Sequence, residues 1–172
     1  MRVVPITPGT RPELAALEAQ ILAQRGSISP LYQVLLNSPP IAQGWEHMLS
    51  AVRKRNSLSA GLRELVILRV AILNRAPYEF DAHVPHALAA HVSQVAINAT
   101  RVIPLSVDAP LSPAERIAMQ LTDTMTRDIE VPDALYSEVK KHFDAQEQID
   151  LVATIAAYNM VSRFLVALHI GH

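Results

Sequence analysis

Two glutamates and a histidine in the first half of the chain have the types and spacing for acid–base chemistry. Glu79 and His83 are four residues apart, about one turn of a helix, so the carboxylate can hold the imidazole and favour its protonated form. A protonated histidine near neutral pH can act as a general acid. Glu64 could complete a proton relay. The chain has no cysteine, which excludes thiol peroxidation and disulfide exchange.

Each of these residues also has a structural interpretation. A Glu–His pair one turn apart on an exposed helix contributes only about 0.2–0.5 kcal/mol to stability. Glu64 lies in the segment 61–74, whose apolar residues surround a helix axis almost completely, so its carboxylate needs hydrogen-bond donors or a cation. An ion pair with Arg63 or Arg69 would meet that need without any catalytic role.

A metal site is a third interpretation, because Glu79, His83 and His86 are all possible ligands. Residues seven positions apart on a helix are about 10 Å apart along its axis, whereas metal–ligand bonds are about 2 Å long. At most two of the three side chains can therefore share one ion. The remaining histidines are scattered along the chain, and we expect no metal site.

The elements that would position these residues are helices, and the fold class is all-α. No alternating strand pattern, glycine-rich phosphate loop or internal repeat is present. The segment 101–110 is expected to be a loop, and Pro85 is expected to kink the helix that carries His83. Helix starts are predicted from four signals: Thr10 with Glu13 for a helix through Gln24 that ends at Gly26, Ser38 with Pro39 and Pro40, Ser112 with Pro113 and Glu115, and Asp144 with Glu147.

Composition limits the class of protein further. The 172 residues, 50% hydrophobic and 18% charged, are enough for one buried core and fit a single domain over residues 1–172. The formal charge of -1 and pI near 6.6 give no basic footprint for nucleic acid or anionic lipid. The N-terminus lacks a signal pattern and the apolar runs look too short to span a bilayer, so we expect a cytoplasmic protein. The apolar excess favours a homo-oligomer.

Four segments together resemble the carboxymuconolactone decarboxylase family, which is related to alkylhydroperoxidase D. The resemblance covers about residues 30–170 and leaves 1–29 as an N-terminal helical extension. The segments are RELVILRVAIL, PYEFDAHVPHALAAHVS, LSPAERIAMQLTDTMT and YNMVSRFLVAL. Where the peroxidase branch has a glutamate, two cysteines and a histidine, this chain has Glu64, Ala76, Glu79 and His83. The family's hydroperoxide chemistry therefore cannot transfer, although the acid-and-histidine half of the relay can.

The resemblance implies an all-helical fold in which a helical hairpin carries the site, a trimer or hexamer, and no cofactor. It implies decarboxylation or proton transfer on a small unsaturated lactone or keto acid, with Glu64, Glu79 and His83 as catalytic residues. His83, held by Glu79, would protonate the developing dienolate, and Glu64 would orient or relay. Substrate contacts are expected from Tyr78, His86, Tyr158, Asn159 and Arg163. The alternative is a non-catalytic ligand-binding or scaffold oligomer with a structural Glu–His pair.

Overall fold

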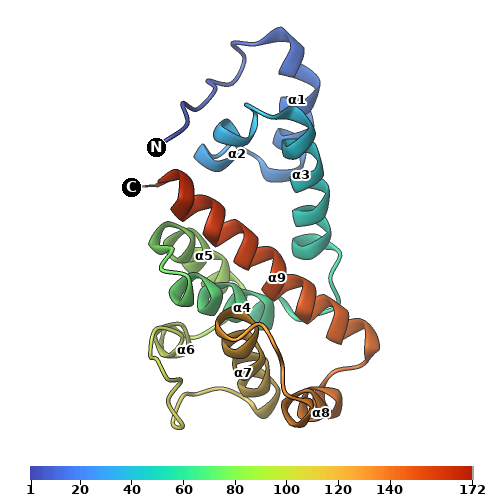
Figure 1. The fold of residues 1–172 in the computed structure, drawn as a ribbon, viewed down its shortest axis with the longest axis vertical. Helices are drawn as coiled ribbons and strands as arrows, with labels where there is room; N and C mark the ends of the chain where they lie inside the picture. The colour runs from blue at the N-terminus through green and yellow to red at the C-terminus, as the bar shows by residue number, and fades with distance from the viewer. Residues whose placement is uncertain (172) are drawn as a thin grey trace. The chain divides into compact units, whose positions relative to one another are not determined.

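The computed structural model describes residues 1–171, and these residues form helices connected by loops, with no strand among them. Figure 1 follows the helices in chain order. After a short 3-10 helix, Pro12–Leu14, they are α1 (Ala15–Arg25), α2 (Pro30–Leu35), α3 (Pro39–Lys54), α4 (Ala60–Leu73), α5 (Pro77–Ala89), α6 (Gln94–Ala99), α7 (Pro113–Arg127), α8 (Asp133–His142) and α9 (Ala145–Leu168). The all-α prediction is confirmed.

The chain divides into two compact units, which are described separately. One unit comprises Met1–Arg55 with Leu165–His172, and the other comprises Asn56–Phe164. The boundary near residue 55 lies well beyond residue 29, where the sequence suggested that an N-terminal extension ends. All three candidate catalytic residues belong to the unit Asn56–Phe164, so the site can be described within one unit.

Helix α4 forms the centre of the unit Asn56–Phe164. Nine of its residues are buried, as the apolar pattern around its axis predicted. Ser59 caps its first turn by accepting a hydrogen bond from the backbone N–H of Leu62, at 3.2 Å. Helices α5 and α7 pack against it. The core on its α5 side is built from Leu68, Ala71, Phe80, Ala87 and Ile97.

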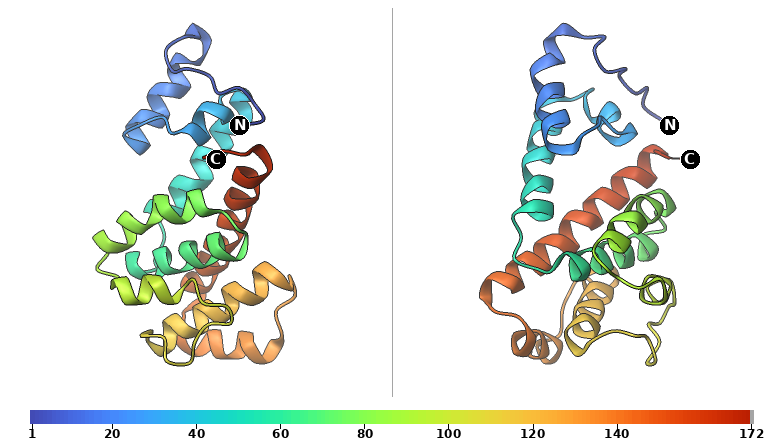
Figure 2. Two further views of the ribbon diagram at one scale, coloured as in Figure 1. Left: turned by 90° about the vertical axis from the view of Figure 1, so that its left-hand side faces the viewer. Right: turned by 180° about the vertical axis from the view of Figure 1, so that it is seen from behind.

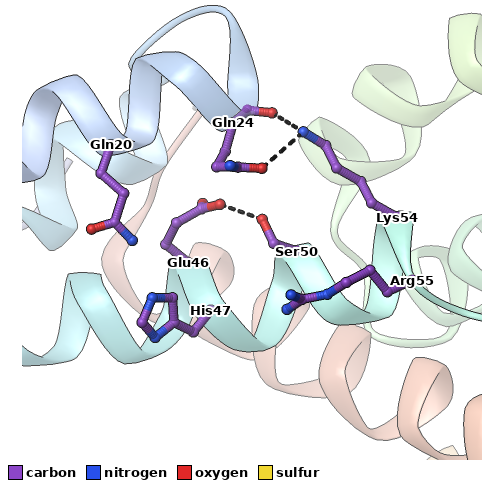
Figure 3. Close-up of a pocket in the computed structure, with 7 residues that line it drawn as sticks. All are labelled: Gln20, Gln24, Glu46, His47, Ser50, Lys54 and Arg55. Atoms are coloured by element: carbon purple, nitrogen blue, oxygen red, sulfur yellow. Dashed lines mark hydrogen bonds between the residues drawn. The ribbon is translucent and has the colours of Figure 1, made fainter.

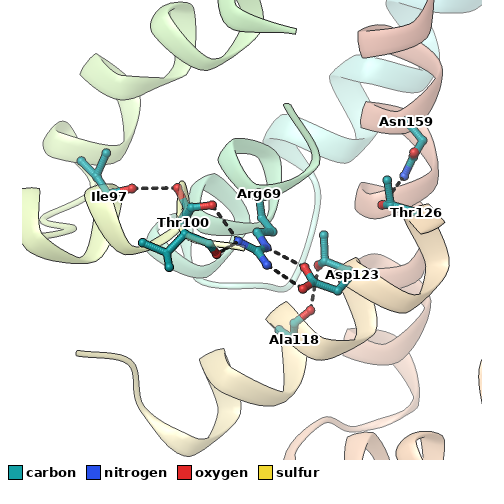
Figure 4. Close-up of polar contacts among 9 residues, drawn as sticks. Arg69, Ile97, Thr100, Ala118, Asp123, Thr126 and Asn159 are labelled. Atoms are coloured by element: carbon teal, nitrogen blue, oxygen red, sulfur yellow. Dashed lines mark hydrogen bonds and ion pairs between the residues drawn. The ribbon is translucent and has the colours of Figure 1, made fainter. Parts of the chain in front are cut away.

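Buried polar contacts fasten the loop 101–110 and α7 to α4 (Figure 4). The fully buried Arg69 forms two parallel hydrogen bonds of 2.6 Å to the carboxylate of Asp123. Its remaining donors reach the backbone carbonyls of Thr100 and Val102, at 2.9 and 2.7 Å. Arg69 therefore holds the start of the predicted loop against the core, because its planar guanidinium can donate several hydrogen bonds in fixed directions.

The predicted capping boxes at α7 and α9 are confirmed, but the one at Thr10 is wrong. Ser112 with Glu115, and Asp144 with Glu147, form reciprocal side-chain to backbone hydrogen bonds. Thr10 instead donates its hydroxyl proton to the carbonyl of Thr7, and the chain passes through the 3-10 turn before α1 begins. A local hydrogen bond has displaced the cap, as is common for threonine. Gly26 ends α1 in the left-handed conformation, φ 77°, as expected.

Along α3, apolar residues repeat at spacings of three and four, at Ile41, Trp45, Met48 and Val52, which predicts one buried face, but only half of them are buried. Trp45 and Val52 are buried, but Ile41 and Met48 are 55% and 45% exposed. The buried face also includes Glu46 and Ser50, two polar residues that the hydrophobic pattern did not select. The short helix α2 was not predicted either, because six residues are too few to show a helical period.

Helix α9 is long and apolar enough to cross a membrane by length and composition, which the sequence analysis overlooked. Its most apolar window has a mean hydropathy of 1.6, and half of that window is buried within the protein. Core helices of soluble proteins meet the same criterion. Thr154 and Asn159 form side-chain hydrogen bonds within the unit Asn56–Phe164, at 3.0 and 2.9 Å. These polar contacts are those of a core helix.

Candidate acid–base site

Glu64, Glu79 and His83 form one cluster, here called the histidine cluster. The Nδ1 atom of His83 lies 2.6 Å from Oε2 of Glu64, and Nε2 lies 3.3 Å from Oε1 of Glu79. Both ring nitrogens of one imidazole thus face carboxylates. Because a carboxylate is an acceptor, both nitrogens are best satisfied when each carries a proton, which is the imidazolium form.

The turn between α4 and α5 brings these residues together. Arg75 takes a left-handed conformation, φ 55°, and the N–H groups of Arg75 and Ala76 donate to the carbonyls of Ile72 and Ala71. This is a Schellman ending, and Pro77 starts α5 immediately afterwards. The two helices therefore run antiparallel and side by side, as two views show (Figure 2). Glu64 on the first helix reaches His83 on the second.

The cluster is removed from solvent. The exposed fractions are 4% for Glu64, 6% for Glu79 and 4% for His83. Burial by itself would lower the pKa of His83, but the hydrogen bonds to Glu64 and then Glu79, together with their charges, outweigh burial, and the pKa is raised above the ordinary value of 6.5. The raised pKa favours the imidazolium form of His83, which can donate a proton.

The histidine cluster places one imidazole between two carboxylates. Charged groups in a buried site are costly unless they are paired, and the contacts of His83 with Glu64 and Glu79 provide such pairing. The shorter contact belongs to Glu64, and Glu79 faces the other nitrogen. The roles predicted for these two carboxylates stay predictions.

Of the two arginines considered as partners of Glu64, Arg69 is bonded to Asp123 and to loop carbonyls, as described above. Arg63 lies next to Glu64 in sequence, and its buried Nε has no hydrogen-bond partner among the described residues. An ion pair between Arg63 and Glu64 stays a prediction.

Three of the five predicted substrate contacts lie near the histidine cluster. Tyr158 of α9 is buried and meets the His83 ring edge to face, with centroids 5.2 Å apart. The ring of the exposed His86 is 5.5 Å from that of His83. Tyr78 precedes Glu79 and is half-buried; burial, with the charge of Glu79, raises its pKa. Each can border a ligand that reaches His83, and these roles stay predictions.

The other two predicted contacts do not meet the cluster in any described bond. The Asn159 amide donates to Thr126 at 2.9 Å and accepts from Asn74 at 2.9 Å, which fastens α9 to α7 and to the end of α4 (Figure 4). Arg163 is exposed on α9. Asn159 therefore serves packing, while Arg163 remains accessible to an approaching anion. Helix α5 continues through Pro85, and a kink there stays a prediction.

A second buried polar group in the other unit was missed by the sequence analysis. It surrounds Glu46, which is fully buried on α3 and bonded to Arg25, Tyr32 and Ser50. The spacing of Glu46 and Ser50, four residues apart beside Trp45 and Leu49, was the available signal. No three acidic or histidine side chains among residues 1–171 are grouped to hold a metal ion.

The helical fold is that of alkylhydroperoxidase D-like proteins. The Carboxymuconolactone decarboxylase family matches residues 39–124, half of the 172 residues, and the chain belongs to this family. That match includes Glu64, Glu79 and His83. It ends before α8 and α9, so Tyr158 and Arg163 lie outside it.

Relatives with known sequences or structures extend the comparison. An uncharacterized protein of Bacillus subtilis, YdfG, is 28% identical over 117 residues, which cover 67% of this chain and 78% of YdfG. A protein of unknown function from Agrobacterium tumefaciens, regarded as an AhpD antioxidant defence protein, matches with a TM-score of 0.73 and 24% identity over 80% of this chain and 94% of its own.

A debrominase, Bmp8, in complex with 2,3,4-tribromopyrrole, has a TM-score of 0.80 and 16% identity, covering 98% of this chain and 90% of its own. These structural similarities, all under 25% identical, concern the fold. The same fold thus occurs in proteins described with different chemistries, and the residues in the site must decide the reaction.

Proposed function

We propose that this protein carries out cofactor-independent acid–base chemistry, a decarboxylation or a proton transfer, on a small unsaturated lactone or keto acid. The observation that supports it is the buried imidazole of His83 held at both nitrogens by carboxylates, 2.6 and 3.3 Å away. General acids in such sites contribute about 10²- to 10⁴-fold to rate. Family membership supports the same class of chemistry.

The proposed reaction balances with one proton. The carbon–carbon bond to the carboxylate breaks, carbon dioxide leaves, and the electron pair moves into the conjugated carbonyl to give a dienolate. His83 then gives the proton on Nε2 to the carbon, and solvent returns a proton to the ring. Glu64 keeps Nδ1 protonated and the ring in place, so Nε2 is the nitrogen that exchanges its proton.

Glu79 limits which substrates can bind. It accepts the Nε2 proton in the resting cluster, so a substrate must displace this contact or receive its proton through Glu79. The carboxylates of Glu64 and Glu79 disfavour a bound carboxylate unless a cation approaches the ligand. The exposed Arg163 is the cation we propose for that purpose, with Tyr78, His86 and Tyr158 along the ligand.

A non-catalytic binding or scaffold protein is the second candidate. It is favoured by the completeness of the cluster: both nitrogens of His83 already have partners, and none of the three side chains is more than 6% exposed. We also propose a homo-oligomer, trimer or hexamer, which would cover exposed apolar side chains such as Val95 and Ile149, at 66% and 68% exposed.

The deciding experiment measures release of carbon dioxide from carboxymuconolactone and a panel of related lactone and β-keto acids. Wild type is compared with His83→Ala and Glu79→Gln, and His142→Ala serves as the matched control, because it removes an exposed histidine of α8. Turnover that survives in the control and is lost in His83→Ala supports the proposal. Equal turnover in His83→Ala would refute His83 as the proton donor, and no turnover in wild type with all proteins folded supports the scaffold.

A further inference from the structure

A cavity beside the missed polar group in the unit that contains Met1–Arg55 has the character of a ligand site. The group, here called the Glu46 cluster, comprises Arg25, Tyr32, Glu46 and Ser50. Oε2 of Glu46 accepts hydrogen bonds from Nε of Arg25, at 2.8 Å, and from the hydroxyl of Tyr32. Oε1 accepts from the hydroxyl of Ser50. Both carboxylate oxygens are therefore fully occupied.

The Glu46 cluster is electrically neutral. Burial would raise the pKa of Glu46, but the hydrogen bonds from Arg25, Ser50 and Tyr32 outweigh it and hold the pKa below the ordinary value. Burial and the bond to Glu46 raise the pKa of Tyr32, so its hydroxyl stays protonated. The cluster is one ion pair, Arg25 with Glu46, surrounded by neutral donors.

Helices α1 and α3 form a cavity of about 300 Å³ against this cluster. Figure 3 shows Gln20 and Gln24 projecting from α1 toward Glu46 and Ser50 on α3, with Lys54 reaching back to α1. Lys54 donates to the backbone carbonyl and, at 3.3 Å, to the side-chain oxygen of Gln24. Cavities that bind small molecules start at about this volume. The remaining lining residues are His47 and Arg55.

The lining has a positive charge. Arg25 neutralises Glu46, so the ammonium of Lys54 and the guanidinium of Arg55 remain as the charges of the lining. The carboxyl ends of α1 and α3 lie nearby, and each helix end contributes only about half a negative charge. Two cationic groups exceed that contribution, so the cavity attracts anions.

We propose that this cavity binds a small organic anion bearing a carboxylate or a phosphate. The anionic group lies at Arg55 and Lys54, the guanidinium giving two parallel hydrogen bonds. The side-chain amides of Gln20 and Gln24 and the ring of His47 contact the uncharged part of the ligand. The hydrogen bonds within the Glu46 cluster keep the floor of the cavity rigid. This site does not rest on the function proposed above.

The test is binding measured by NMR on the full chain at constant ionic strength. The probes are inorganic phosphate, succinate and uncharged ethylene glycol. Each anion that fits should saturate with a Kd of roughly 0.1–1 mM, shifting the side-chain amides of Gln20 and Gln24. Phosphate alone, or succinate alone, identifies the anionic group, and ethylene glycol should produce no saturable shift.

Two variants make the test specific. Arg55→Gln should weaken binding about tenfold, since it removes a charge-assisted contact. Arg53→Gln removes the same charge two residues earlier in the chain, at a side chain that does not line the cavity. The affinity of this variant for the anions should stay within about twofold of wild type. Circular dichroism checks that both variants are folded. Absence of saturable binding for both anions, or equal weakening by Arg53→Gln, would overturn the proposal.

Discussion

The histidine cluster and the Glu46 cluster solve the problem of a buried carboxylate in opposite ways. Glu46 alone receives three donors, one of them the guanidinium of Arg25, and the charges cancel. Glu64 and Glu79 both face the single imidazole of His83, whose pKa is raised. A carboxylate surrounded by donors stabilises a fold, whereas a buried imidazole with a raised pKa between two carboxylates can exchange a proton.

The largest expected effect is on catalytic activity, which should depend on the histidine cluster and not on the Glu46 cluster. His83→Ala should lower turnover of a lactone or keto acid by about 10³-fold, because it removes the proton donor. Tyr32→Phe, in the Glu46 cluster, should leave turnover within about twofold of wild type. Steady-state release of carbon dioxide gives both values. Similar losses in the two variants would mean that the clusters do not divide the roles as proposed.

In stability, the larger loss is expected for a change in the Glu46 cluster and the smaller loss for a change in the histidine cluster. Glu46→Gln leaves Arg25 buried without its carboxylate and should lower the free energy of unfolding by about 3 kcal/mol. Glu79→Gln keeps a polar side chain beside His83 and changes only a contact of 3.3 Å, so it should cost less than Glu46→Gln. Urea denaturation measures both. The control is Glu138→Gln, which breaks the exposed pair with Lys141 and should cost less than about 1 kcal/mol.

The pKa of His83 provides a further test of the comparison. The pKa of His83 should lie above 6.5, and Glu64→Gln should lower it more than Glu79→Gln, because Glu64 makes the shorter contact. Since the folded pKa is raised, the stability from this charge is full below pH 6.5 and is lost as pH rises through the raised pKa. NMR titration of the imidazole protons measures the pKa of His83. A value at or below 6.5 would contradict the imidazolium assignment.

The Glu46 cluster should respond to pH with the opposite sign. Its carboxyl pKa is lowered, so its stabilisation is present above the ordinary value of 4.5 and is lost as pH falls through the lowered pKa. Glu46→Gln should remove that acid dependence. Unfolding curves between pH 3 and pH 6 measure it, and an unchanged acid slope in the variant would assign the dependence to other carboxylates.

The smallest expected effect concerns one hydroxyl. Tyr32→Phe removes one of the three donors to Glu46 and should destabilise the protein by about 1 kcal/mol. Tyr136→Phe, on the half-exposed face of α8, should change stability by less than about 0.5 kcal/mol. Thermal or urea unfolding distinguishes them, and an equal loss in both would show that Tyr32 is not a significant donor.

Local signals predicted much of the fold. The capping boxes at Ser112 and Asp144 and the glycine stop at Gly26 depend on a few adjacent residues, and the structure has all three. The signal at Thr10 failed, since the hydroxyl found the carbonyl of Thr7 first. Hydrophobic spacing predicted α3 but not which face is buried, because Ile41 and Met48 fit the period and are still exposed.

The sequence by itself determined the helical class, the burial of α4 and the Glu79–His83 pair, because helix periodicity places residues one turn apart on one face. Only the tertiary structure decided that Glu64, nineteen residues before His83 in the chain, is its closer partner. It also decided that Arg69 turns to Asp123 and that Glu46 is buried among donors. The physical reason is that partners on different helices depend on how those helices pack, which no spacing along the chain specifies.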